Sequence, residues 1–176
     1  MSSRCEKVPQ SRLEPLGMKA SPGQCLLLGV DQSPIEAFVQ IAGDFMSMSA
    51  ESFVAEVEKN ATFAKLTKLA AQAYNAQVAQ SVGCGQAHAL EERLARWILM
   101  SHDRVGGDTV QLTQEFLGLM LGVQRPTVTL AATALQNAGL IRYQRGVIDV
   151  INREGLEASA CECYEKVRKE YERLMC

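Results

Sequence analysis

Apolar residues in the C-terminal half of the chain recur three and four positions apart, the spacing of helices with one buried face. Leu117 and Leu121 share such a face, and Val128 and Ala131 share another shortly afterwards. Gly122 lies between the two segments, where a left-handed turn costs glycine almost nothing. The pattern therefore predicts two short helices that pack together across a tight turn.

Two helices that meet at a glycine-containing turn form the helix-turn-helix, whose second helix enters the major groove of DNA. Gly118 supports this interpretation because it is small enough for the second helix to cross closely. The alternative is a plain helical hairpin. Residues 140–151 then form two β-rich runs around Arg145-Gly146, which predicts a hairpin, or wing, directly after the second helix. An edge hairpin with solvated arginines is the alternative to a wing.

Further helices are predicted on both sides of this region. Ser49 is a good N-cap for a helix over 50–58, and a second helix runs from about Ala61 to Val82. A helix from Leu90 to about His102 carries a broad apolar face on which Trp97 is read as a core residue. After Asn152 the pattern predicts one final helix with an apolar stripe: Leu156, Ala160, Cys163, Val167 and Leu174.

The N-terminal part of the chain has a different character. Residues 1–20 are polar, with scattered charges and two prolines, and are expected to be disordered. Three β-rich runs follow, at 25–28, 37–41 and 44–48, and are predicted as strands. The predicted fold class is mainly α with small β elements.

The overall composition says little about function, but the charge of one segment is informative. The chain has 176 residues, 47% hydrophobic and 22% charged, and a formal net charge of -2, which gives no argument for nucleic acid. Residues 113–147 are different, because three arginines there accompany a single acidic residue, Glu115. Such a separation of charge suits a protein that touches phosphates with one face.

Neither a membrane segment nor a catalytic or metal-binding arrangement is predicted. The chain has no apolar run of 18 residues and no signal-peptide core, so a cytoplasmic location without membrane contact is expected. No nucleophile–base arrangement or phosphate loop is visible, so the chain is not expected to be an enzyme. Cys84 and His88 could share a helix face, but two ligands make no site, and Cys161 and Cys163 are too close for a zinc knuckle. No metal and no cofactor are therefore predicted.

Several motifs in residues 91–174 resemble the C-terminal winged helix of Crp-Fnr-type bacterial transcription regulators. They are Arg93-Leu94-Ala95-Arg96-Trp97, His102-Asp103-Arg104-Val105-Gly106, Leu112-Thr113-Gln114-Glu115-Phe116-Leu117, Leu121-Gly122-Val123-Gln124-Arg125-Pro126-Thr127-Val128-Thr129 and Leu135-Gln136-Asn137-Ala138-Gly139-Leu140-Ile141.

The resemblance implies four regions. These are a disordered N-terminal segment (1–22), a shortened remnant of a cyclic-nucleotide-binding-like jelly roll (23–60), a long dimerisation helix (61–86) and a winged helix-turn-helix DNA-binding domain (87–176). Roughly the first half of the jelly-roll sensor is missing, so its remnant is expected to be unstable unless another chain covers it.

The resemblance also implies a homodimer that reads duplex DNA. Arg125 matches the guanine reader of the family, while Pro126 and Leu130 replace polar readers, so the operator should differ from that of the best-known relatives. The predicted DNA-binding residues are Thr113, Gln124, Arg125, Pro126, Thr127, Thr129, Leu130, Arg142 and Arg145. The predicted dimerisation residues are Phe63, Leu66, Ala70, Ala73, Gln77 and Ser81, with a helix packed on its own sheet as the alternative.

Other partners follow from the same resemblance. The positions that hold cyclic nucleotide in relatives read Gly23-Gln24 and Ile35-Glu36 here, without an arginine, so cyclic nucleotide is not expected to bind. The loop 105–108 resembles the surface that contacts RNA polymerase in some relatives, although a flexible connector is an equal alternative. A second function is also open: a protein-interaction module that heterodimerises with a full-length relative and modulates it.

Overall fold

The computed structural model describes residues 23–33, 47–105 and 107–175. These divide into two compact units, one made of the residues up to Val78 together with those from Glu170 onward, and one made of Ala79–Lys169.

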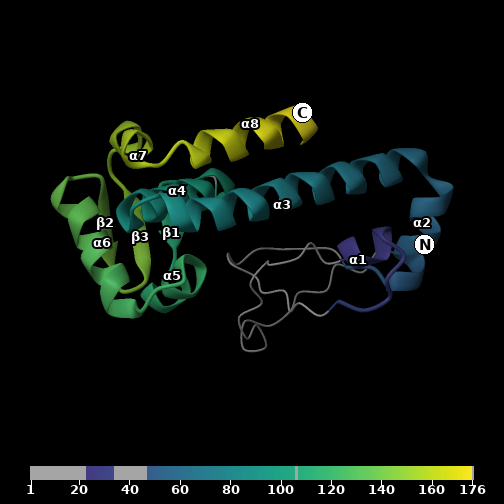
Figure 1. Ribbon diagram of the computed structural model, residues 1–176, viewed down its shortest axis with the longest axis horizontal. Coiled ribbons are helices and arrows are strands. Elements are labelled where there is room, and N and C mark those ends of the chain that lie inside the picture. Colours follow the sequence, from purple (N-terminus) through teal and green to yellow (C-terminus); the bar gives the residue numbers. More distant parts are fainter. Residues whose placement is uncertain (1–22, 34–46, 106, 176) are drawn as a thin grey trace. The chain divides into compact units, whose positions relative to one another are not determined.

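The first unit contains helices α1 (Gln24–Leu27) and α2 (Ala50–Lys59) and the larger part of α3 (Ala61–Ala87) (Figure 1). Ser49 caps α2 as predicted, because its hydroxyl oxygen accepts the backbone N–H of Ser52 at 3.1 Å. Asn60 then begins α3 by accepting the N–H of Phe63 at 3.0 Å. The short α1 is tied to α3 by a hydrogen bond from the side chain of Gln24 to that of Asn75.

The second unit begins with the end of α3 and continues with α4 (Leu90–Val105), whose middle is buried in the core. All eight residues from Leu94 to Ser101 are buried, Trp97 among them as predicted. Helices α5 (Gln114–Leu121), α6 (Arg125–Asn137) and α7 (Arg153–Ser159) pack against α4, and α8 (Cys163–Met175) follows.

A small antiparallel sheet completes this unit. Its strand order is β1 (Thr109–Gln111), β3 (Val147–Val150), β2 (Ile141–Gln144). Ile148 pairs with Val110 on one side and Tyr143 on the other, and it is fully buried. Figure 1 shows the strands beside α6, while α4 packs on β1. Strand β1 was not predicted, since its three residues show no distinctive pattern.

The α5–α6 pair forms as the apolar pattern predicts. Gly122 adopts a left-handed conformation (φ 67°) and ends α5, while Val128 and Ala131 of α6 have no exposed surface. A Cβ at Gly118 would lie only 2.8 Å from the carbonyl oxygen of Val123. The close approach that the sequence suggested at this glycine is therefore confirmed.

The wing also forms as predicted. Arg145 (φ 52°) and Gly146 (φ 81°) both have left-handed backbones and join β2 to β3, which is the geometry of a two-residue type I′ hairpin turn.

Two predictions about secondary structure are wrong. The run Cys25–Leu28, predicted as a strand, lies in α1 and its C-cap instead, because a short apolar run does not distinguish a strand from a helix. The expected single helix after Asn152 is broken into α7 and α8, since Ala160 adopts an extended backbone. The N-terminal segment 1–22 and the strand at 37–41 lie outside the described residues. So does most of the strand at 44–48, whose last two residues are in no strand.

A polar network joins α4 to the pieces on both sides of this break. Arg153 donates to Asp103 at 2.7 Å, to Glu157 at 2.9 Å and to the hydroxyl of Tyr164 at 2.9 Å. Tyr164 in turn donates to Asp103, and burial raises its pKa to about 12, so it remains a hydrogen-bond donor at all physiological pH values.

We predict that Gly118→Ala destabilises the second unit by about 1–3 kcal/mol, because the added methyl group meets a backbone carbonyl that cannot swing away. Urea unfolding followed by circular dichroism measures this. The matched control is Gly83→Ala in α3, where a Cβ meets nothing within 4 Å and helix propensity favours alanine by up to about 1 kcal/mol. Equal stability of the Gly118→Ala and wild-type proteins would contradict the packing described.

Candidate nucleic-acid interface

The first turns of α6 present a row of side chains to solvent. Gln124 is the N-cap residue, Arg125 and Pro126 open the helix, and the proline costs no hydrogen bond because first-turn N–H groups have no intrahelical partner. The exposed side chains in this row are Gln124, Arg125, Pro126, Thr127, Thr129 and Leu130. Leu130 is 72% exposed, so this row contains one large aliphatic side chain beside its polar ones.

Gln114, from the first turn of α5, organises this row. Its side-chain oxygen accepts from Nε of Arg125 at 3.3 Å and from the hydroxyl of Thr129 at 3.0 Å. Thr129 also donates to the backbone oxygen of Arg125 at 3.1 Å. The guanidinium of Arg125 is thus exposed, and its hydrogen bond to Gln114 restricts its position, which lowers the entropy lost when it binds a ligand.

An open depression lies between α5, α6 and the wing. Tyr143 forms part of its wall and donates its hydroxyl to the backbone oxygen of Leu112 at 2.8 Å. Burial raises the pKa of this hydroxyl, and the positive charge of Arg125 opposes the rise. The lining residues are Thr113, Gln114, Glu115, Arg125, Tyr143, Arg145 and Gly146. The lining therefore contains two arginines and only one carboxylate, Glu115, and this excess of positive charge suits an anionic ligand.

Thr113 and the wing are joined directly. Thr113 caps α5 as predicted, accepting the N–H of Phe116 at 3.1 Å. Its methyl group lies 3.3 Å from the position that a Cβ on Gly146 would occupy, and Leu112 donates its N–H to the oxygen of Gly146 at 2.8 Å. The wing tip, with Arg145, is therefore fixed beside the N-terminus of α5.

Arg142, the other arginine of the wing, is paired with a carboxylate. Two of its nitrogens donate to Asp149 on the neighbouring strand, at 2.8 and 3.0 Å, and the two residues are register partners. Hydrogen bonds from Arg142 and from Thr109 lower the pKa of the Asp149 carboxyl. Arg142 therefore offers a phosphate less net charge than Arg145 does, although both side chains are exposed.

The residues predicted for dimerisation are only partly available on the surface. Ala73 has no exposed surface within a single chain, and Ser81 accepts a hydrogen bond from Arg96 at 3.0 Å. Phe63 makes an edge-to-face contact with Phe53, with ring centroids 5.6 Å apart. Leu66 remains 50% exposed, while Ala70 and Gln77 are half-buried.

Two features of the site were missed by the sequence reasoning. Gln114 and Tyr143 were not singled out, although Gln114 directly follows the predicted cap and Tyr143 precedes the predicted turn. The structure also brings Cys84, His88, Cys161 and Cys163 together, a group that no local spacing in the sequence indicates.

The described geometry is that of a winged helix-turn-helix. Residues 92–159 match the family described as the Crp-like helix-turn-helix domain. Residues 92–159 therefore carry a Crp-like helix-turn-helix domain, in agreement with the sequence motifs.

Solved structures share the fold. A Crp/Fnr-family transcriptional regulator from Eubacterium rectale is 22% identical with a TM-score of 0.51, over 66% of this chain and 54% of that one. FixK2 from Bradyrhizobium japonicum is 17% identical with a TM-score of 0.60, over 65% of this chain and 60% of that one. The chain thus spans between half and two thirds of the length of these proteins.

No match is found among curated protein sequences. None of the described helices combines the length and the apolar character that a membrane-spanning helix needs.

The Arg142–Asp149 pair generates a prediction about pH. The pKa of Asp149 in the folded chain lies below its unfolded value of about 4, so the pair stabilises the fold above that pH. This stabilisation is lost as the pH falls through the lower, folded-state value. The Asp149→Asn variant should therefore melt below the wild type at neutral pH, and the gap should narrow in acid. Melting temperatures measured across the pH range test this; a constant gap would contradict it.

Proposed function

We propose that the chain is a transcription regulator that binds specific duplex DNA sequences, with α6 in the major groove and the wing on the adjacent backbone. The observation that carries the proposal is the exposed row at the start of α6, above all the guanidinium of Arg125 held by Gln114. Arginine in this position can donate two hydrogen bonds to the O6 and N7 atoms of guanine, which discriminates by about 1–3 kcal/mol.

The neighbouring side chains suggest which part of the DNA each of them would contact. Thr127 and Thr129 offer hydroxyl groups to bases or phosphate, and Gln124 offers an amide at the helix start. Leu130 offers only an apolar surface, which suits the methyl group of thymine. Thr113 and Arg145, which line the depression, would contact phosphate oxygens.

We infer in addition that the chain acts as a homodimer formed through α3. The support is the exposure of apolar side chains along a long helix, Leu66 at 50%, Val78 at 40% and Val82 at 68%. A single helix-turn-helix reads few base pairs, and two copies would read two half-sites on one face of the duplex. Ala73 is buried within the chain and does not belong to this proposed seam.

The DNA proposal is tested with the full chain purified and incubated with fragmented bacterial genomic DNA at fixed salt, followed by sequencing of the bound fragments. A shared sequence among them supplies the operator. Arg125→Ala should then lose about 1–3 kcal/mol of preference for this operator per half-site and keep weak, salt-sensitive binding.

Arg145→Ala should weaken binding to operator and unrelated DNA alike, and should reduce the salt slope by about 0.9 for each phosphate that the arginine no longer neutralises. Arg168→Ala, on the exposed face of α8, is the matched control and should leave both quantities unchanged. Unselective binding by the wild type, or unaltered discrimination in Arg125→Ala, would refute sequence reading by α6.

The homodimer is tested by sedimentation. Leu66→Glu should shift the chain from dimer to monomer, because it puts a charge into the proposed apolar contact. Gln72→Glu is the matched control on an exposed position of the same helix. A wild-type chain that sediments as a monomer at all concentrations would end the dimer proposal without affecting the proposed DNA contacts of α6.

A further inference from the structure

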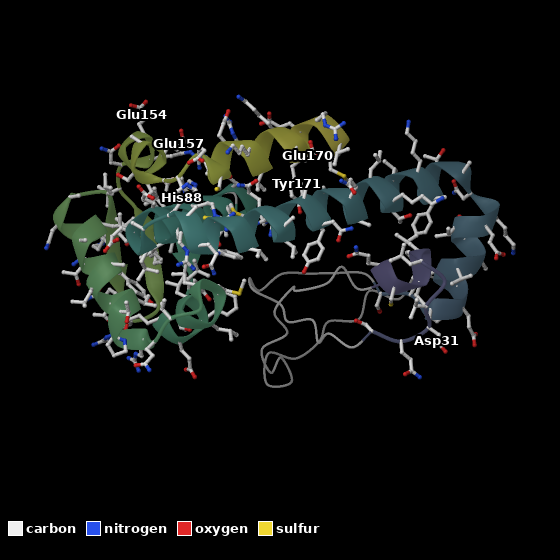
Figure 2. The ribbon with its side chains drawn as sticks, in the orientation of Figure 1. Asp31, His88, Glu154, Glu157, Glu170 and Tyr171 are labelled. Carbon is white, nitrogen blue, oxygen red and sulfur yellow. The ribbon has the colours of Figure 1, made fainter. Side chains whose placement is uncertain are left out.

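Four metal-ligating side chains meet in the second unit, on elements that do not belong to the candidate interface. The sulfur atoms of Cys84 and Cys161 lie 3.5 Å apart, and the sulfur of Cys163 lies 3.6 Å from Nδ1 of His88. All four possible ligand atoms lie within 4.8 Å of one another. Figure 2 labels His88 where the end of α3 meets the start of α8.

The local structure explains how the four side chains converge. Cys84 lies in the last turn of α3 and His88 just after its end, and the N–H of His88 bonds to the oxygen of Cys84 at 3.2 Å, so both side chains leave the same side of the helix end. Cys161 and Cys163 flank the break between α7 and α8, where Cys163 is the first residue of α8. The break that the sequence did not predict is what turns both sulfurs towards α3.

The chemistry and the distances fit one tetrahedral zinc ion. Structural zinc sites use sets such as three cysteines and one histidine, with Zn–S of about 2.3 Å and Zn–N of about 2.0–2.1 Å. A tetrahedron with those bond lengths separates its ligand atoms by about 3.5–3.8 Å. The Cys84–Cys161 and Cys163–His88 separations are 3.5 and 3.6 Å. An iron–sulfur cluster spreads its four ligands over two or more iron atoms and so needs a wider arrangement.

The groups around the four ligands also suit a metal. Nε2 of His88 lies 3.0 Å from a carboxylate oxygen of Glu162, which leaves Nδ1 facing the sulfurs as a ligand. Histidine ligands of zinc are commonly oriented by such a carboxylate. The side-chain amide of Gln80 donates to the sulfur of Cys163 at 2.9 Å.

A buried cation balances the charge that the site would acquire. Arg96 is 1% exposed and donates to Ser81, but its Nε and Nη1 have no hydrogen-bond partner within the described part of the chain. Burial raises the pKa of the Cys84 thiol, and the charge of Arg96 acts in the opposite direction, so the guanidinium lies within electrostatic reach of the cluster. Three thiolates around a dication leave one negative charge, which Arg96 would offset.

We propose that Cys84, His88, Cys161 and Cys163 bind one Zn²⁺ ion that fastens the end of α3 to the start of α8. Cys84, Cys161 and Cys163 are buried and all four ligands come from the protein, so no coordination position remains open for a substrate or water. The site is structural. It is independent of the DNA-binding proposal, because none of its ligands lies on α5, α6 or the wing.

Metal binding by the full-length chain tests the proposal directly. The purified protein is stripped with a chelator under reducing conditions and titrated with Zn²⁺ or Co²⁺. We expect about one metal ion per chain, and for Co²⁺ the intense visible absorption of a tetrahedral site with thiolate ligands. Removing zinc should lower the melting temperature, since the ion binds only the folded arrangement.

Variants then assign the ligands. Cys163→Ser and His88→Gln should each lose most of the bound metal, whereas Cys25→Ser, the same kind of change in the other unit, should retain it. Because Cys163 is buried and its variant could fail to fold, Glu162→Gln provides a second test on an exposed side chain. It should weaken zinc binding about 10–100-fold, measured by chelator competition, while the exposed control Glu154→Gln should not.

The contrary outcomes are equally definite. A reduced wild-type chain that binds neither Zn²⁺ nor Co²⁺, or a Cys25→Ser variant that loses as much metal as Cys163→Ser, would overturn the proposal. So would a chain purified under reducing conditions whose mass spectrum shows Cys84 and Cys161 joined as a disulfide with no metal present.

Discussion

The close contact of α5 with the turn after it sets the position of the α6 side chains in the candidate interface. Gly118 leaves no room for a Cβ beneath the carbonyl oxygen of Val123, and Gly122 supplies the left-handed residue that lets the chain reverse there. Arg93 of α4 donates to the oxygen of Leu121, the last residue of α5, and so satisfies a helix-end carbonyl while joining α5 to the core helix. The start of α6 is consequently fixed by backbone contacts and does not depend on any of the side chains it exposes.

The residues that pack α6 against the core are different from the residues that it exposes. This explains why exposed positions of α6 can hold a proline and a leucine. Pro126 and Leu130 are exposed and support no core packing, whereas Val128 and Ala131 between and beyond them are fully buried. The buried positions are constrained by volume. The exposed ones carry no such packing constraint, apart from the limit that Gln114 sets by holding Arg125 and Thr129 together. A bound duplex would meet a guanidinium whose position is already restricted, and part of the entropy cost of recognition is thereby met during folding.

The sequence predicts those parts of the fold that local interactions determine. The caps at Ser49, Thr113 and Asn152 and the Arg145-Gly146 turn depend on neighbours within a few residues, and each forms as predicted. Features that depend on contacts between residues far apart in the sequence could not be predicted from local patterns. Strand β1 exists because Val110 is buried against Ile148, which is 38 positions later in the chain. The run at Cys25–Leu28 has no period long enough to separate strand from helix, and resemblance to a family of larger proteins favoured the wrong alternative.

The group of three cysteines and His88 also depends on residues that are distant in the sequence, so sequence analysis did not find it. Cys84 and His88 give two ligands and Cys161 and Cys163 give two more, and each pair alone is uninformative, since a metal site is defined by all its ligands at once. What joins the pairs is a break between α7 and α8 that the apolar stripe conceals, because Leu156, Cys163 and Val167 are all buried whether or not one helix contains them. The break is held on both sides by Arg153, which bonds to Asp103 on α4 and to Tyr164 on α8. Its geometry is therefore supported by polar contacts of its own, and a bound ion would reinforce a junction that the fold already forms.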